Sequence, residues 1–132
     1  MPVIDDIYLG NPNLKKANVP VEFTQDQILE FMACKHDPVY FAKQHVKIVS
    51  LDEGLTPFKP YKFQETLIKN FHENRFNICK MPRQTGKSTT CISYLLHYAV
   101  FNDNVNIAVL ANKASTARDL LGRLQLAYEN LP

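Results

Sequence analysis

The sequence lacks tryptophan altogether and has only four glycines and three cysteines among its 132 residues. The cysteines, Cys34, Cys79 and Cys91, are odd in number and show no C-x-x-C spacing. They therefore argue against a disulfide framework and indicate a reducing compartment. Cys34 and His36 are close in sequence but lack two further metal-ligating partners at a workable spacing, so a spectator cysteine is favoured over a metal site.

Long apolar runs and an excess of one charge are missing as well. No segment approaches the ~20 apolar residues of a membrane span, and the N-terminus has no basic region followed by an apolar one. These absences predict a soluble protein that is neither exported nor bound to a membrane. The net charge of +2 mixes 15 basic with 13 acidic residues, and such a mixture neither supports nor excludes nucleic acid as a partner.

The residues that are present suffice for a folded domain. A hydrophobic fraction of 45% with 11% aromatic residues can build a core, which argues against global disorder. The length allows one small domain or part of a larger one. The composition is therefore typical of a globular protein. It does not indicate a function, which has to be inferred from sequence motifs.

The most informative motif is the tripeptide Gly86-Lys87-Ser88, the core of a phosphate-binding loop. An alternating apolar segment at 76–79 predicts a strand before it, and the helical spacing of residues 89–101 predicts a helix after it. This context is what such a motif requires. We therefore interpret the stretch as a nucleotide loop rather than as an exposed turn with an incidental lysine.

The residue types of this loop suit a nucleoside triphosphate. Without a side chain at Gly86, the backbone can approach a phosphate closely. The N–H groups from Thr85 to Thr89 then converge at the positive end of a helix dipole. Lys87 would reach the β- and γ-phosphates, and the Ser88 hydroxyl is the expected ligand for Mg²⁺, which prefers hard oxygen donors.

The chain is predicted to have an α/β fold in three parts. Residues 1–22, rich in Pro, Asn and Asp, are expected to form an extended arm without regular structure. Residues 23–56 predict a helical lead-in and a short strand, and residues 57–132 predict the first part of a P-loop core. In that core, an apolar run at 105–110 predicts a second, parallel strand, which completes a strand–helix–strand unit. A final helix is expected from 114 to 131.

Residues typical of helix starts predict two helices within residues 23–56. Thr24 can cap a helix, and Gln27 can close a capping box with it. Asp37 as cap and Pro38 in the first turn predict the start of a second, short helix. On the helix after the loop, His97 is expected to pack at the rim of the core rather than to act as a catalyst.

A strand is also predicted at 46–51, and the acidic residues Asp52 and Glu53 follow it. An apolar strand that ends in an acidic pair resembles the arrangement that binds Mg²⁺ in nucleotide hydrolases. In such domains, however, that strand follows the phosphate loop, and Gly54 here indicates a hairpin turn. We therefore interpret both acidic residues as solvated turn residues.

Phe63 and Gln64 lie a short distance before the predicted loop strand. An aromatic ring can stack on adenine, and a glutamine amide can make paired hydrogen bonds to the base edge. The same two side chains also suit a helix start over the core. Beside a phosphate loop, the adenine interpretation is preferred.

Together these stretches resemble the ATPase region of the large terminase subunit of tailed bacteriophages, most closely its T-even-like branch. The likeness covers nearly the whole chain in order and approximate spacing. Terminase loops resemble Arg-Gln-x-Gly-Lys-[Thr/Ser], so Met81, which stands where the full phosphate-loop motif has its first glycine, is consistent with the family. The matching stretches are Asn13–Asn18, Asp37–Ala42, Phe63–Gln64, Arg83–Ser88 and Leu110–Lys113.

The resemblance implies a motor that uses ATP and Mg²⁺ to drive viral DNA through a portal into an empty capsid, with a nuclease domain that cuts the DNA concatemer. Double-stranded DNA, the portal protein and the small terminase subunit are the implied partners, and the host cell cytoplasm is the implied location. The implied fold is a partial, helicase-like P-loop NTPase fold with an N-terminal helical or extended arm.

The resemblance also implies residue roles. Arg83 acts on the γ-phosphate as a catalytic arginine within the same subunit. Gln64 reads adenine, and Phe63 stands where a tyrosine is usual, so stacking is retained while any hydroxyl contact is lost. Asn112-Lys113 matches a helicase-like motif to which no role is assigned. The implied phosphate-binding residues are Gln84, Thr85, Gly86, Lys87, Ser88 and Thr89.

In the family, the chain continues after the position of Pro132 with an acidic strand that supplies the Mg²⁺-binding aspartate and the water-activating glutamate. We therefore expect no ATP hydrolysis by this sequence alone. An open sheet edge would favour association with itself or with a second polypeptide that completes the site. Two other interpretations stay open: a helicase-like or restriction-type ATPase fragment, and a non-enzymatic interaction module derived from a terminase.

Overall fold

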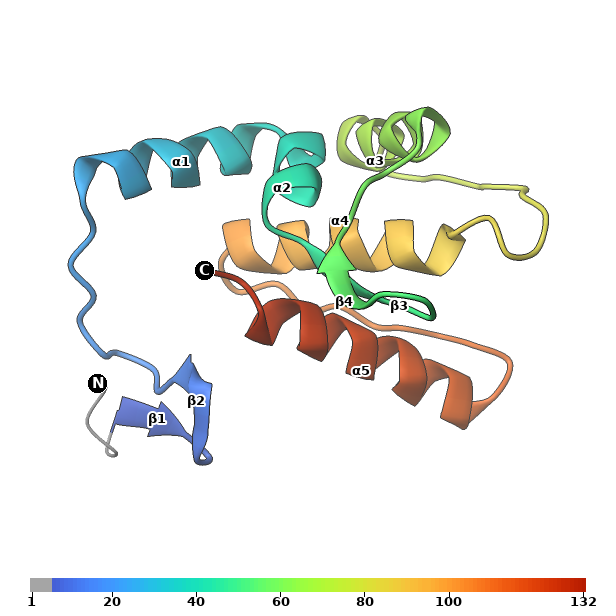
Figure 1. The fold of residues 1–132 in the computed structure, drawn as a ribbon. Helices are drawn as coiled ribbons and strands as arrows, with labels where there is room; N and C mark the ends of the chain where they lie inside the picture. The colour runs from blue at the N-terminus through green and yellow to red at the C-terminus, as the bar shows by residue number, and fades with distance from the viewer. Residues whose placement is uncertain (1–5) are drawn as a thin grey trace.

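The computed structural model describes residues 6–132, and these residues form a mixed α/β structure. The described part contains five helices and two small antiparallel sheets (Figure 1). None of its helices combines the length and the apolar character needed to cross a membrane. The elements are β1 (Ile7–Tyr8), β2 (Asn11–Lys15), α1 (Gln25–His36), α2 (Pro38–Gln44), β3 (Lys47–Ser50), β4 (Gly54–Pro57), α3 (Lys62–Glu73), α4 (Lys87–Phe101) and α5 (Ala114–Glu129).

The N-terminal arm contains a hairpin that the sequence analysis missed. Strands β1 and β2 pair in antiparallel fashion, with Tyr8 opposite Asn11. The two turn residues, Leu9 and Gly10, both have positive φ angles, +50° and +76°, which is the backbone that a two-residue hairpin turn requires. The expectation of no regular structure is therefore wrong for this part of the arm, while residues 1–5 lie outside the described residues.

Helix α1 begins at the predicted cap. The Gln27 amide N–H donates to the Thr24 hydroxyl at 3.3 Å, and the Thr24 N–H donates to the Gln27 side-chain oxygen at 2.9 Å. This reciprocal pair satisfies two N–H groups that a helix start would otherwise leave without partners. The predicted capping box is confirmed.

Helix α2 also begins as predicted. One carboxylate oxygen of Asp37 accepts hydrogen bonds from the N–H groups of Val39 and Tyr40, at 2.9 and 3.1 Å. Pro38 occupies the first turn, where its missing N–H costs nothing. The helix then turns the buried side chains of Val39 and Phe41 into the core.

The predicted strand at 46–51 is confirmed as β3, which pairs with β4 in a hairpin. Asp52 and Glu53 lie exposed in the turn, and Gly54 has a φ angle of +69°. The interpretation of the two acidic residues as solvated turn residues is consistent with this geometry. The hairpin lies against α5, so it closes one side of the core.

The core is organised around α4, which crosses the middle of the molecule with α3 on one side and α5 on the other (Figure 1). Leu96 of α4 and Ile68 of α3 are both almost completely buried there. Three polar residues of α4, namely Thr90, Ser93 and His97, are buried on the same face, because spacings of three and four residues repeat with the helical period.

The prediction that His97 packs at the rim is wrong, since only 3% of this residue is exposed. Its Nε2 lies 2.8 Å from the carbonyl oxygen of Cys34. Its ring packs against Phe41 and Phe101, with centroid distances of 5.5 and 4.7 Å. The histidine replaces solvent contacts with one hydrogen bond and an aromatic cage, which sequence spacing alone does not reveal.

The parallel strand–helix–strand core is not shown by the described residues. The segments 76–79 and 105–110, predicted as strands, flank α4 but belong to no sheet in this part of the chain. A strand requires a paired strand to satisfy its backbone, and neither segment is paired in the described residues. Their outward side chains, including Ile78 and Leu110, are consequently exposed.

The buried histidine predicts a pH dependence of stability. Burial lowers the pKa of His97, so the unfolded chain takes up a proton before the folded chain does as pH falls through about 6.5. The free energy of unfolding should fall with pH below that value, by at most about 1.4 kcal/mol per pH unit for one group. Urea denaturation at several pH values measures this slope.

The control for this measurement uses a second histidine. His97→Gln should reduce the slope, whereas His36→Gln at an exposed position should leave it unchanged. Equal slopes in wild type and His97→Gln would show that another group carries the effect.

Candidate nucleotide site

The predicted phosphate loop ends in a left-handed residue at the start of α4. Gly86 is the N-terminal cap, with a φ angle of +74° and a ψ angle of +23°. Its carbonyl oxygen accepts the N–H of Thr90 at 3.0 Å and the Thr90 hydroxyl at 2.8 Å. Gln84 also has a positive φ angle, +59°. Two left-handed residues in three positions are compatible with an anion-binding loop, in which successive N–H groups point to one side.

Gly86 is required for steric reasons as well. A Cβ atom added there would lie 2.5 Å from Nε2 of Gln64, closer than side-chain carbons approach in real structures. Nε2 itself donates to the Gly86 carbonyl at 3.3 Å. The loop backbone at Gly86 can therefore lie this close to α3 only because Gly86 has no side chain.

Gln64 connects two helix starts. Its side-chain oxygen accepts the N–H of Tyr61 at 2.8 Å and so caps α3, while its nitrogen reaches Gly86 at the start of α4. Only 3% of the residue is exposed. In this structure the amide links α3 to the loop, and its oxygen and nitrogen are both hydrogen-bonded to backbone groups.

Lys87 lies across the inside of the loop. Its ammonium group donates to the carbonyl oxygen of Met81 at 3.1 Å, and the Thr85 hydroxyl donates to the carbonyl of Pro82 at 3.0 Å. These bonds bring the two ends of the loop together around the lysine. The next residue, Ser88, is exposed in the first turn of α4, so its hydroxyl is free to meet a ligand from solvent.

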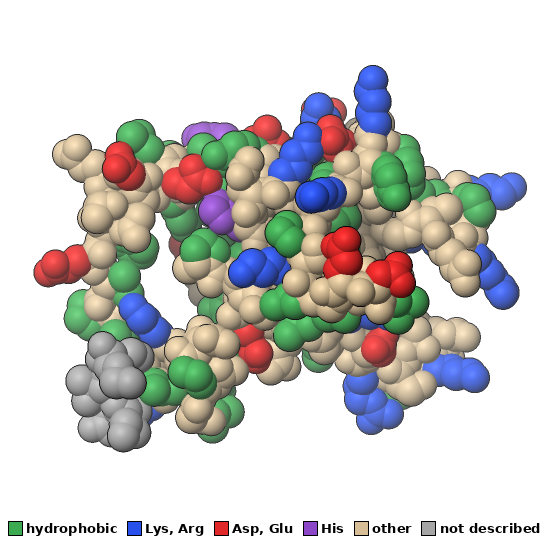
Figure 2. Space-filling view, viewed as in Figure 1, with side chains coloured by type: hydrophobic (Ala, Val, Ile, Leu, Met, Phe, Trp, Pro, Cys, Tyr) green, Lys and Arg blue, Asp and Glu red, His purple; other side chains and the backbone are tan. Residues whose placement is uncertain are grey.

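The segment between α3 and α4 carries several positive charges. Residues 74–87 include Arg75, Lys80, Arg83 and Lys87 and no acidic residue. Figure 2 shows lysine and arginine side chains around the right-hand edge of the molecule, where the loop between α3 and α4 lies in Figure 1. Such a concentration of one sign attracts phosphate groups.

The aromatic part of the predicted adenine pair lies at the surface. Phe63 is 46% exposed and stacks on Tyr61, with ring centroids 5.9 Å apart and planes 9° from parallel. Tyr61 lies only two positions from Phe63 in sequence, but it was not predicted as a member of this pair. The two rings form an exposed platform on the first turn of α3, beside the residue that contacts the loop.

A cavity of about 170 Å³ adjoins the loop on the side of α5. Apolar side chains of α4 and α5 line it together with Val109, Lys87 and Ser88. The lining is too apolar for a phosphate, so the loop amides and not this cavity are the candidate phosphate site. Asn112 and Lys113 lie exposed just before α5 and make no contact that assigns them a role.

A scan against family models finds no match for the sequence. The chemistry of the site therefore rests on the geometry of the residues themselves.

The close approach at Gly86 predicts a large effect of a single methyl group. Gly86→Ala should lower the free energy of unfolding by more than the roughly 1–2 kcal/mol that a left-handed alanine costs, because the added Cβ displaces Gln64. Gly10→Ala is the matched control, since Gly10 has nearly the same φ angle, +76°, and open space around it. Chemical denaturation of both variants measures the difference.

A further variant identifies the cause. Gln64→Ala combined with Gly86→Ala should be less destabilised than the sum of the two single variants, because the clash has been removed. Additive losses, or equal losses at Gly10 and Gly86, would contradict the steric explanation.

Proposed function

We propose that this chain is the ATP-binding N-terminal portion of a phage terminase large subunit, the ATP-driven motor that packages viral DNA into a procapsid. The observation that carries the proposal is the left-handed Gly86 cap, held against Gln64 at the start of a 15-residue helix, with Lys87 folded inside the loop. The N–H groups at the start of α4 support a bound phosphate chain, because they lie at the positive end of the helix dipole next to a glycine that adds no side chain.

Each residue of the loop has a defined part in this proposal. The N–H groups of residues 85–89 bind the phosphate oxygens at the positive end of α4. Lys87 exchanges its bond to the Met81 carbonyl for the β- and γ-phosphates, and Ser88 ligates Mg²⁺, which neutralises phosphate charge when bound. Arg83 is exposed in the loop and supplies further positive charge to the γ-phosphate.

The fold proposed for this function is a partial P-loop NTPase fold with parallel strands on either side of α4. Residues 105–110 support it, because their exposure alternates: Val105, Ile107 and Val109 are half-buried, whereas Asn106, Ala108 and Leu110 are exposed. A period of two is the pattern of a strand with one face packed on helices. We propose that this segment and residues 76–79 pair with further strands supplied in the complete motor or by a partner.

Adenine binding by Phe63 and Gln64 is part of the proposal, with one condition from the structure. The Tyr61–Phe63 platform is open to a stacking base, but the Gln64 amide must release the Tyr61 N–H or the Gly86 carbonyl before it can bind the base edge. Adenine binding would then loosen the contact between α3 and the loop.

The decisive measurement is a calorimetric titration with Mg-ATP. Hydrogen bonds to charged groups contribute about 1.5–3 kcal/mol each, so Lys87→Ala should weaken binding about 10–100-fold. Lys69→Ala removes an exposed lysine of α3 and is the matched control, with no expected change. Circular dichroism of each variant verifies that the helices are intact.

The outcomes separate the proposed functions. No binding of Mg-ATP by the wild type, or equal binding by Lys87→Ala, would contradict a nucleotide loop and favour a non-enzymatic interaction module. Lys87-dependent binding without any affinity for a phage portal protein would favour a helicase-like or restriction-type ATPase over a terminase.

A further inference from the structure

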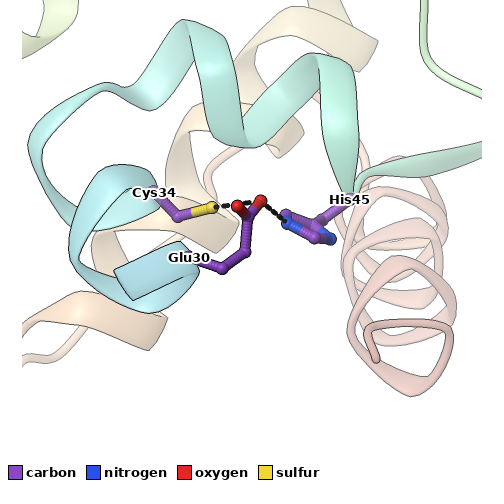
Figure 3. Close-up of side chains that lie close together, drawn as sticks. All are labelled: Glu30, Cys34 and His45. Carbon is purple, nitrogen blue, oxygen red and sulfur yellow. Dashed lines mark hydrogen bonds and ion pairs between the residues drawn. The ribbon is translucent and has the colours of Figure 1, made fainter. Parts of the chain in front are cut away.

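A second cluster of chemically active side chains lies at the corner between α1 and α2. Glu30 and Cys34 are one turn apart on α1, and His45 is the residue that ends α2 (Figure 3). Nε2 of His45 lies 2.8 Å from Oε1 of Glu30, and the Cys34 sulfur lies 3.8 Å from the same oxygen. The three ligand atoms are all within 4.8 Å of one another.

These separations fit a tetrahedral divalent cation. With zinc–sulfur bonds near 2.3 Å and zinc–nitrogen or zinc–oxygen bonds near 2.0–2.1 Å, neighbouring ligand atoms are roughly 3.3–3.6 Å apart. The distances from Oε1 of Glu30 to Nε2 of His45 and to the Cys34 sulfur, 2.8 and 3.8 Å, lie on either side of that range. Small side-chain adjustments therefore suffice, and the helix backbones need not move.

The surroundings of the cluster support its use as a ligand set. The Tyr40 hydroxyl donates to Oε2 of Glu30 at 3.0 Å, which fixes the carboxylate and leaves Oε1 toward the other two side chains. Hydrogen bonds from His45 and Tyr40 lower the pKa of Glu30, so the carboxylate is ionised. The side chains of His45 and Glu30 are 21% and 41% exposed, which gives an ion a path from solvent.

We propose that Glu30, Cys34 and His45 bind one divalent cation of the zinc class, with water in the fourth position. Sulfur, imidazole and carboxylate ligands together suit zinc and cobalt better than magnesium or calcium, which require oxygen ligands. The site is separate from the nucleotide loop and does not depend on the function proposed for it. Its structural effect is to join the second half of α1 to the end of α2.

The buried thiol sets one requirement for binding. Only 3% of Cys34 is exposed, and burial raises the pKa of its thiol to about 11. The metal must therefore displace the thiol proton, as it does in other cysteine sites. Cys34 and His36 lack further ligands at a workable spacing in sequence, and His36 is indeed exposed and outside the cluster. The proposed ligands beside Cys34 are Glu30, one turn earlier on α1, and His45, the capping residue after α2.

The test uses cobalt, which reports thiolate ligation by a near-ultraviolet charge-transfer absorption. Titration of the whole 132-residue chain with Co²⁺ should give this absorption at one equivalent, and Zn²⁺ should abolish it by competition. Cys34→Ser should remove it completely. Cys79→Ser and Cys91→Ser are matched controls, because they remove the other two cysteines, and both should keep it.

The remaining variants separate ligands from supporting residues. Glu30→Gln and His45→Gln should each weaken Co²⁺ binding by more than tenfold, with circular dichroism showing that the helices persist. Tyr40→Phe, which removes only the hydroxyl behind the carboxylate, should keep the absorption and weaken binding 10–100-fold at most. An absorption that disappears with Cys79 or Cys91 instead, or none at one equivalent of Co²⁺, would overturn the proposal.

Discussion

The carbonyl oxygen of Gly86 joins three parts of the molecule. It accepts the backbone N–H and the hydroxyl of Thr90 from α4 and the side-chain amide of Gln64 from α3. Because the same amide also caps α3 through Tyr61, the starts of both helices are fixed to each other. The candidate phosphate loop is therefore held by one buried glutamine, and this close approach requires glycine at position 86.

The features that could be predicted from sequence depend on neighbours along the chain. The capping box at Thr24 and the aspartate cap at Asp37 are read from residues within four positions of each other, and both are present. The β3–β4 hairpin follows from an apolar run and a turn glycine. The helix after the phosphate loop begins at Lys87, within the motif that predicted it.

The features that could not be predicted depend on contacts between distant segments. His97 is buried because α1 supplies the Cys34 carbonyl 63 positions earlier in the sequence. Gln64 matches an adenine-binding pattern, but its burial against Gly86 becomes visible only when α3 and the loop are seen together. The segments 76–79 and 105–110 have strand patterns without paired strands, because a pattern specifies a preference and a sheet requires a partner.

Helix α4 extends from one candidate site to the other. Its first residue belongs to the phosphate loop, and His97, about 15 Å further along at 1.5 Å per residue, reaches the carbonyl of Cys34. Both candidate sites therefore depend on the placement of a single helix.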